Sequence, residues 1–385
     1  MTGHVTVLVG TSKGVFLIQS DAERTTWDLR GPFCDGWPIN HVIGDPTTGT
    51  IWAAGGGEWQ GVGVWRSDDG GENWSLSKLA NGKFDEMLAT DPGFAAYFGN
   101  PPPADPAPYT GKISALWSLG RSGDTLYAGT KPAALYASTD RGTTWTCVQG
   151  LSDHPSGDSW EPGAAGLVLH SIVADPGNPA KLWVGISSAG VFATEDGGTT
   201  WDRRNRRSNA YVVEHDHGHD HGPDVGLCVH NMVRAPQLGD LLYQQNHHGV
   251  FRSFDGGRNW QVIQTGLPSS FGFPIAVHPH DPETLWTFPL NGDSAGRYPP
   301  DASAAVWRSR DGGQSWHAMQ DGLPVKNCYF TVLRQALCTD QETAAGVYFG
   351  TNTGSVFAST TAGDTWSEIA RHLPMVAPVE TLTRN

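Results

Sequence analysis

The chain has 385 residues and a formal net charge of −14, with 39 acidic side chains against 25 basic ones. An acidic surface repels phosphate groups, so the composition argues against nucleic acid and against anionic membranes as partners. No apolar run has the length of a membrane span. The first residues lack a basic segment followed by an apolar one, and the five cysteines show no CxxC spacing. We therefore expect a cytoplasmic protein with reduced thiols.

Short apolar segments alternate with turns rich in Gly, Ser, Thr and Asp, which is typical of an all-β chain. The first unit opens with a predicted strand at residues 4–10, followed by another at Gly14–Phe16. Later units repeat this order, with predicted strands at Thr125–Gly129, Lys181–Gly185 and Gly190–Phe192. Turns such as Asp45-Pro46 and Asp175-Pro176 separate the first strand of a unit from the second.

One pattern, Ser/Thr-x-Asp-x-Gly-x-Thr/Asn/Ser-Trp, recurs between the third and fourth predicted strands of each unit. Good copies span residues 67–74, 138–145, 194–201, 253–260 and 309–316, and degenerate copies span 20–27 and 359–366. The Asp side chain caps backbone N–H groups, the Gly supplies a positive φ, and the Trp starts the next strand. We expect the carboxylates of Asp68, Asp140, Asp196, Asp255 and Asp311 to cap turns and not to catalyse a reaction.

The pattern resembles that of the Asp-box or BNR-repeat families, which include sialidases, sortilin-type domains, xyloglucanases and photosystem II assembly factors. The resemblance covers nearly the whole chain and implies a β-propeller. Copies recur every ~50–70 residues, the span of one four-stranded blade, and seven copies predict seven blades. The resemblance does not extend to sialidase activity, because the Arg-Ile-Pro motif of sialidases is absent near the N-terminus.

The first unit lacks its innermost strand, whereas the tail at 375–383 alternates apolar residues and has no Asp box after it. We predict that this tail pairs into the N-terminal blade and closes the ring, which removes two open sheet edges. The expected fold is all-β: one seven-bladed β-propeller over residues 1–385, with four antiparallel strands in each blade.

Strand direction alternates within a blade, so the Asp boxes and the Asp-Pro turns lie on one face of the ring. The remaining loops lie on the opposite face. The long insertions all belong to that second face: 80–112, 150–166, 203–226 and 289–304. Long loops on one side of a rigid scaffold commonly build a binding site.

Histidines gather on this long-loop face. Aligned on the Asp-Pro turns, Asn40, His170 and His230 hold equivalent positions where the innermost strands meet the channel. Neutral imidazoles from separate blades can converge on one ion. We predict a divalent metal (Zn, Mn, Fe, Cu or Ca) at the channel mouth, with His170, His230 and His247 as ligands and His41, His215 and His217 as further candidates. In the alternative interpretation, His170 and His230 are hydrogen-bonded structural residues and the 214–222 run is a solvated loop.

Other candidate residues are expected on the same face. Glu58, Glu161 and Glu214 are candidates for a fourth ligand or a general base, and His248 for moving protons. Lys13, Lys131, Arg297, Lys326 and Arg334 are candidates for binding a substrate carboxylate or phosphate. Trp59 and Tyr329 could contribute to an aromatic wall.

Three classes of function fit these features. The first is a metal-dependent hydrolase or lyase acting on a small polar or anionic substrate. The second is a glycoside hydrolase with paired carboxylates such as Glu58 and Glu161. The third is a non-catalytic scaffold like the assembly factors. The enrichment in histidine favours the first class, and the sequence leaves the oligomeric state open.

Overall fold

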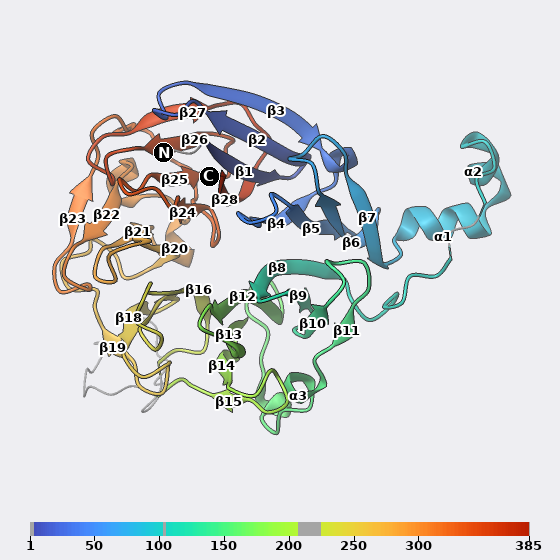
Figure 1. Ribbon diagram of the computed structural model, residues 1–385, viewed down its shortest axis with the longest axis horizontal. Helices are drawn as coiled ribbons and strands as arrows, with labels where there is room; N and C mark the ends of the chain where they lie inside the picture. Colours follow the sequence, from blue (N-terminus) through green and yellow to red (C-terminus); the bar gives the residue numbers. More distant parts are fainter. Residues whose placement is uncertain (1–3, 103–104, 207–224, 385) are drawn as a thin grey trace.

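The computed structural model describes residues 4–102, 105–206 and 225–384. The strands form seven sheets, each of four antiparallel strands, and the sheets are arranged in a ring (Figure 1). The predicted seven-bladed propeller is therefore confirmed. The innermost strands of neighbouring blades contact one another around the ring.

The four strands of each blade are named below in order from the channel outward. Blade 1 has β28 (Val376–Arg384), β1 (His4–Thr11), β2 (Gly14–Ser20) and β3 (Trp27–Phe33). Blade 2 has β4 (Ile39–Gly44), β5 (Ile51–Gly57), β6 (Gly61–Ser67) and β7 (Ser75–Ala80). Blade 3 has β8 (Ala115–Ser122), β9 (Thr125–Lys131), β10 (Leu135–Ser138) and β11 (Thr146–Cys147).

The remaining blades continue in chain order. Blade 4 has β12 (Val168–Asp175), β13 (Asn178–Ser187), β14 (Gly190–Thr194) and β15 (Asp202–Arg203). Blade 5 has β16 (Val229–Arg234), β17 (Leu242–Asn246), β18 (Gly249–Ser253) and β19 (Gln261–Val262). Blade 6 has β20 (Gly272–Val277), β21 (Leu285–Pro289), β22 (Val306–Ser309) and β23 (His317–Met319). Blade 7 has β24 (Leu337–Thr339), β25 (Val347–Gly350), β26 (Val356–Ser359) and β27 (Ser367–Ala370).

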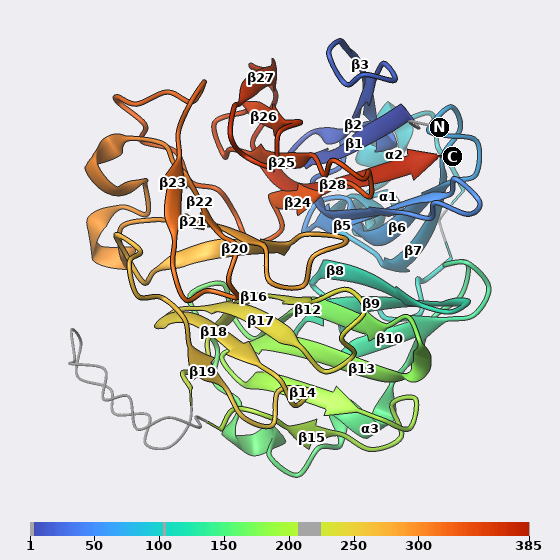
Figure 2. The ribbon, with the colours of Figure 1, turned by 60° about the vertical axis from the view of Figure 1, so that its left-hand side comes forward.

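The ring closes as predicted. Strand β28 pairs with β1 in antiparallel register, from His4 opposite Arg384 to Thr11 opposite Val376. The two ends of the chain therefore lie side by side, as both ribbon views show (Figures 1 and 2). Closure by the last strand gives the first blade its full set of four strands.

Helices occur in the loops that connect or interrupt blades. The hairpin of α1 (Lys83–Thr90) and α2 (Pro92–Tyr97) projects from the ring between blades 2 and 3 (Figure 1). Shorter helices are η1 (Cys34–Gly36), α3 (Gln149–Ser152), η2 (Gly157–Ser159), η3 (Asp293–Ala295) and η4 (Pro300–Ala302). None of the helices in the described ranges has the length and hydrophobicity needed to span a bilayer.

The Asp box has the predicted turn structure. In blade 6, Asp311 accepts the backbone N–H of Ser315 at 2.9 Å and the hydroxyl of the same residue at 2.6 Å. The Ser309 hydroxyl accepts the N–H of Gly313 at 2.8 Å, and Gly313 has a φ of +89°, which a side chain would strain. The indole of Trp316 is buried and donates its N–H to the carbonyl of Ile263 in the preceding blade at 2.6 Å.

The first good box corrects one assignment. Its capping carboxylate belongs to Asp69, which accepts the N–H of Asn73 at 2.9 Å, and not to Asp68 as expected. Asp68 instead forms ion pairs with Arg66 at 3.2 Å and, across the blade boundary, with Arg141 at 2.6 Å. The spacing of the pattern, counted from Ser67, also places the capping Asp at position 69, so the expectation for Asp68 was shifted by one residue.

Tryptophans of the second strands connect neighbouring blades through the Asp boxes. The indole N–H of Trp52 in blade 2 donates to the carbonyl of Arg141 in the box of blade 3, at 2.9 Å. The same contact joins Trp183 to Gly256 between blades 4 and 5, at 2.8 Å. It recurs from Trp286 to the box of blade 7. A box therefore shapes its own turn and also holds the preceding blade.

Substitutions in the boxes test this description. Asp311→Ala removes the acceptor of the Ser315 N–H, so we expect a loss of about 1 kcal/mol in the free energy of unfolding. In the degenerate box of blade 7, Thr361 already accepts the N–H of Thr365 at 2.9 Å. We expect Thr361→Asp to raise stability by up to about 1 kcal/mol, because a carboxylate is the stronger acceptor. Denaturant unfolding measures both, and unchanged stability of Asp311→Ala would contradict the capping role.

Candidate functional site

The innermost strands are bulged where they meet the channel. Register shifts against the second strand occur in β4, β8, β12, β16 and β20. In three of them the extra residue is Asn40, His170 or His230, so the predicted equivalence of these positions holds. A β-bulge re-aims the side chain of the extra residue, which is why such irregularities often border functional sites.

The hairpin of β16 and β17 brings a cysteine and two histidines together. The N–H of His247 donates to the carbonyl of Cys228 at 2.9 Å, so these residues lie opposite one another at the open end of the hairpin. His230 follows Cys228 by two residues. The potential ligand atoms of Cys228, His230 and His247 all lie within 4.8 Å of one another.

Hydrogen bonding defines the tautomer of His230. Its Nδ1 lies 2.6 Å from the carbonyl oxygen of Gly272, so Nδ1 carries the proton and donates it. Nε2 of the neutral ring is then left with its lone pair. The ring is 2% exposed and packs against Phe271 and Phe273. This imidazole is thus held rigidly in one orientation.

The three groups shift one another's pKa. Burial raises the pKa of the Cys228 thiol, but hydrogen bonds with His230 and His247 outweigh burial and bring it down to about 4. The hydrogen bond with Cys228 raises the pKa of His247. Burial lowers the pKa of His230 to about 4. At neutral pH the cluster therefore combines a thiolate with one neutral imidazole.

The cluster lines a cavity of about 660 Å³ over blades 4 to 7. Two guanidinium groups border it, with Arg297 at 5.7 Å and Arg334 at 5.2 Å from the ring centre of Phe273. Two carboxylates, Glu161 and Asp293, also line it. The walls come from the second-face loops, including the predicted insertions 150–166 and 289–304, so those loops do build a cavity.

Asp293 connects the basic and histidine parts of the cavity. Its carboxylate accepts a hydrogen bond from Nε of Arg297 at 2.6 Å and lies 3.8 Å from Nε2 of His247. Glu161 is exposed and makes no ion pair with any residue that the structure describes. The two carboxylates therefore differ in their surroundings.

The segment before β24 forms the floor of this cavity. Asn231 donates to the carbonyl of Arg334 at 2.7 Å, and the side chain of Gln335 donates to the carbonyl of His170. The N–H of Val379 in blade 1 donates to the carbonyl of Gln335 at 2.8 Å. The segment thus bridges three blades across the channel.

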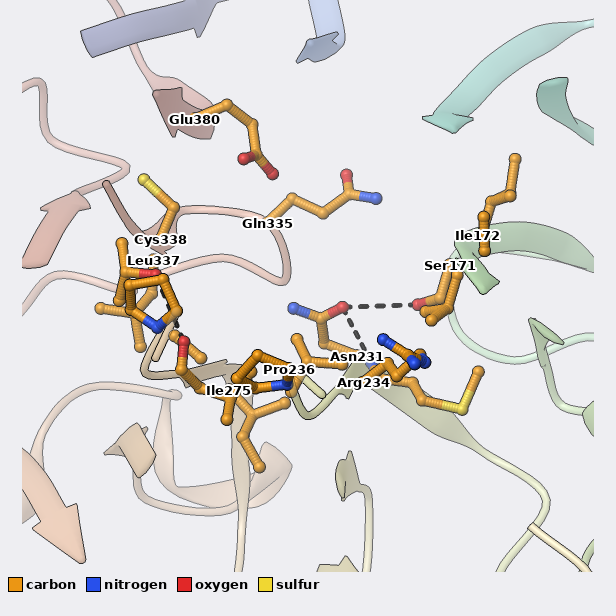
Figure 3. A pocket seen from close by; sticks show the side chains of 18 of the residues that line it. Ser171, Ile172, Asn231, Arg234, Pro236, Ile275, Gln335, Leu337, Cys338 and Glu380 are labelled. Carbon is orange, nitrogen blue, oxygen red and sulfur yellow. Dashed lines mark hydrogen bonds between the residues drawn. The ribbon is translucent and has the colours of Figure 1, made fainter. Parts of the chain in front are cut away.

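A second cavity, of about 430 Å³, is lined by Gln335 (Figure 3), whereas the adjacent residue Arg334 lines the first cavity. Gln335 extends into it between Glu380 and Ser171 (Figure 3). Its walls include residues next to the turns between first and second strands, such as Pro236 and His278. The channel is therefore divided into two chambers, and the Cys/His cluster lies in the first.

Two predicted ligands lie apart from the cluster. His41 lines the second cavity, where its Nδ1 accepts the N–H of Leu119 at 2.8 Å and its Nε2 is 3.7 Å from Glu380. His170 is 1% exposed, and its Nδ1 is 3.0 Å from the hydroxyl of Ser171. Its Nε2 has no hydrogen-bond partner among the described residues. Of the predicted ligands, His230 and His247 are the ones brought together.

The other predicted residues are divided between the cavity and its surroundings. Glu161, His248 and Arg297 line it. Lys131 lies at its edge and donates to the carbonyl of Ala165 at 2.7 Å. Glu214, His215 and His217 lie outside the described residues.

Five further predicted residues do not line the cavity. Lys326 lines a separate pocket beside Phe330 and Phe357. Glu58 is exposed and pairs with Lys83 at 2.5 Å. Trp59 packs on Phe84 of α1 at 6.0 Å between ring centres. Tyr329 packs on Tyr298 at 5.1 Å, and Lys13 is exposed in the β1–β2 turn. Lys13 belongs to blade 1 and Glu58 and Trp59 to blade 2, outside the blades that form the cavity. Tyr329 follows blade 6 but faces Tyr298.

Sequence reasoning missed Cys228 and Asp293. From the sequence, Cys228 is only one of five reduced thiols, although it directly precedes β16, which contains His230, and His247 directly follows β17. An uninterrupted count of the antiparallel register from the turn between β16 and β17 places Cys228 opposite His248, and the bulge at His230 shifts it by one residue to face His247. The spacing of these residues around the turn therefore indicated their proximity but not the exact pairing.

Known proteins share the repeat and the fold. The BNR/Asp-box repeat family matches residues 65–76. A xyloglucanase of Hypocrea jecorina (strain QM6a) is 25% identical over 363 residues, which cover 84% of this chain and 41% of that enzyme. A xyloglucanase of Acetivibrio thermocellus is 25% identical over 212 residues, which cover 50% of this chain and 23% of that enzyme. The chain thus spans less than half the length of these curated relatives.

Solved structures of other proteins share this fold. A GH74 enzyme of Niastella koreensis has a TM-score of 0.57 at 14% identity, covering 96% of this chain and 56% of that one. YCF48 from Cyanidioschyzon merolae has a TM-score of 0.53 at 14% identity, covering 86% and 84% of the two chains. At this identity the likeness concerns the fold, and the chain is an Asp-box β-propeller.

The burial of His170 predicts a pH dependence of stability. Burial and the nearby Arg334 guanidinium hold the pKa of His170 well below its usual range. The unfolded chain takes up a proton at this residue below about pH 6.5, whereas the folded chain does not. Stability is therefore present above that pH and is lost as the pH falls. We expect His170→Gln to flatten this loss in denaturant unfolding between pH 7.5 and 5, and equal slopes for both proteins would contradict it.

Proposed function

We propose that the chain is a glycoside hydrolase whose site is the cavity over blades 4 to 7. The observation that carries this proposal is that two carboxylates of different surroundings, Glu161 and Asp293, line one cavity. The likeness to proteins named xyloglucanases supports hydrolysis of a glycosidic bond. The volume of the cavity, about 660 Å³, suits a small ligand such as one or two sugar rings.

The chemistry follows from what a glycosidic bond requires. One carboxyl group protonates the departing oxygen, and a second activates water or attacks the anomeric carbon. Glu161 is free of ion pairs with described residues and is suited to exchange a proton. Arg297 donates a hydrogen bond to Asp293 and so fixes the orientation of its carboxylate, which suits the second role, activating water or attacking the anomeric carbon. The pair of Glu58 and Glu161 considered from the sequence is replaced, because Glu58 does not line the cavity.

Metal-dependent hydrolysis is the second candidate. The specific observation in its favour is the cluster of Cys228, His230 and His247 in the same cavity. A bound divalent ion there would activate water or polarise a substrate oxygen. The fold likeness to YCF48 offers no residue-level argument for a scaffold role.

Kinetics on conservative variants test the first candidate. We expect Glu161→Gln and Asp293→Asn each to lower kcat by ~10²–10⁴ on aryl glycosides or xyloglucan oligosaccharides, because each removes a proton-transfer or nucleophilic group. Glu58→Gln is the matched control and should retain full activity. Full activity in Glu161→Gln, or no hydrolysis of any glycoside in the panel, would contradict the proposal. Loss of activity on chelation would instead favour the second candidate.

A further inference from the structure

The cluster of Cys228, His230 and His247 has the chemistry of a metal-binding site. A thiolate and neutral imidazoles are the ligands that zinc and similar ions prefer in proteins. All three come from one hairpin and its flanks, so one rigid element holds them together. His230 is 2% exposed, and an ion would meet a ligand that is already oriented.

The surroundings of the two histidines match those of metal ligands. A ligating histidine commonly donates its second ring N–H to a backbone carbonyl or a carboxylate. His230 does so through Nδ1 to the carbonyl of Gly272 at 2.6 Å, which leaves Nε2 for an ion. The carboxylate of Asp293 lies 3.8 Å from Nε2 of His247 and favours a proton on that nitrogen.

We propose that Cys228, His230 and His247 bind one divalent cation of the zinc type, with a fourth position left for water or a substrate atom. Metal–ligand bonds of about 2.0–2.3 Å hold the ligand atoms of a tetrahedral ion roughly 3.5 Å apart. The observed separations reach at most 4.8 Å, so small side-chain rotations suffice to close the site. Structural zinc sites use four protein ligands, whereas catalytic sites use three and keep one position open.

The charges of the cavity indicate the class of ligand for the open position. A divalent ion with one thiolate keeps a net positive charge, and the guanidinium groups of Arg297 and Arg334 border the same cavity. Carboxylate or phosphate oxygens would satisfy both the ion and these donors. An anionic group is therefore the expected fourth ligand or close neighbour. This site does not depend on the glycosidic activity proposed above.

Cobalt provides a direct test, because a thiolate bound to Co²⁺ gives an intense near-ultraviolet charge-transfer band. We expect the chelator-treated full chain to develop this band at one Co²⁺ per chain and to lose it when Zn²⁺ displaces the cobalt. The histidine-rich run at 214–222 contains no cysteine, so it cannot produce the band.

Variants assign the ligands. We expect Cys228→Ser to abolish the band. We expect His247→Gln to weaken Zn²⁺ binding by more than ~10²-fold, because loss of a residue that only orients a ligand weakens metal binding by at most about that factor. Cys147→Ser and His170→Gln are the controls and should leave the band and the affinity unchanged. Absence of the band in the native chain, or its persistence in Cys228→Ser, overturns the proposal.

Alkylation of the native chain keeps the test decisive if a variant does not fold. We expect Zn²⁺ to slow iodoacetamide modification of Cys228 by more than ~10-fold while Cys147 reacts at an unchanged rate. Equal rates with and without Zn²⁺ would mean that the thiolate is not a metal ligand. These readouts measure binding, so their failure leaves the glycosidase kinetics unaffected, and the two proposals fail separately.

Discussion

The contact between a tryptophan of one blade and the Asp box of the next is the interaction on which the rest of the structure depends. The indole N–H of Trp52, Trp183 or Trp286 donates to a carbonyl inside the following box. In each of these boxes the Ser hydroxyl accepts the N–H of the Gly, which fixes the turn that presents the carbonyl. Each of these three boxes therefore contacts the preceding blade as well as shaping its own turn. Where this contact forms, it sets the position of two neighbouring blades and so contributes to the geometry of the channel at the centre of the ring.

Two irregularities turn this regular ring into a site. Bulges in the innermost strands place His230 at the channel mouth beside a thiol and a second imidazole. The segment carrying Arg334 and Gln335 then crosses the channel and is anchored to blades 1, 4 and 5 by hydrogen bonds. It separates a cavity rich in charge from a second chamber beneath it. Both irregularities lie where the strands meet the second-face loops, far from the Asp boxes that set the framework.

The sequence predicted the fold because its signal is local. A box needs only eight consecutive residues, and the closing strand was recognisable as an alternating tail without a box. The site depends on longer-range features. Cys228 faces His247 only through the register of a hairpin. His170 occupies a position like that of His230 yet points into another environment, and His41 lies one residue beyond the equivalent position. The Gln335 segment could not be foreseen at all, because nothing in its composition marks a chain that crosses a channel. The capping residue Asp69, in place of Asp68, is the one that the spacing of the box pattern gives when it is counted from Ser67.

The cavity brings together two kinds of chemistry, a carboxylate pair and a Cys/His cluster, and the cluster is the part that the hairpin geometry specifies most closely. Anomalous diffraction at the zinc absorption edge, from crystals of the full chain soaked in Zn²⁺, tests it most directly. The predicted result is a peak about 2.0–2.3 Å from the Cys228 sulfur and from one nitrogen each of His230 and His247. A map with no peak at these three residues, or with its strongest peak at His41 or His170, would contradict the assignment.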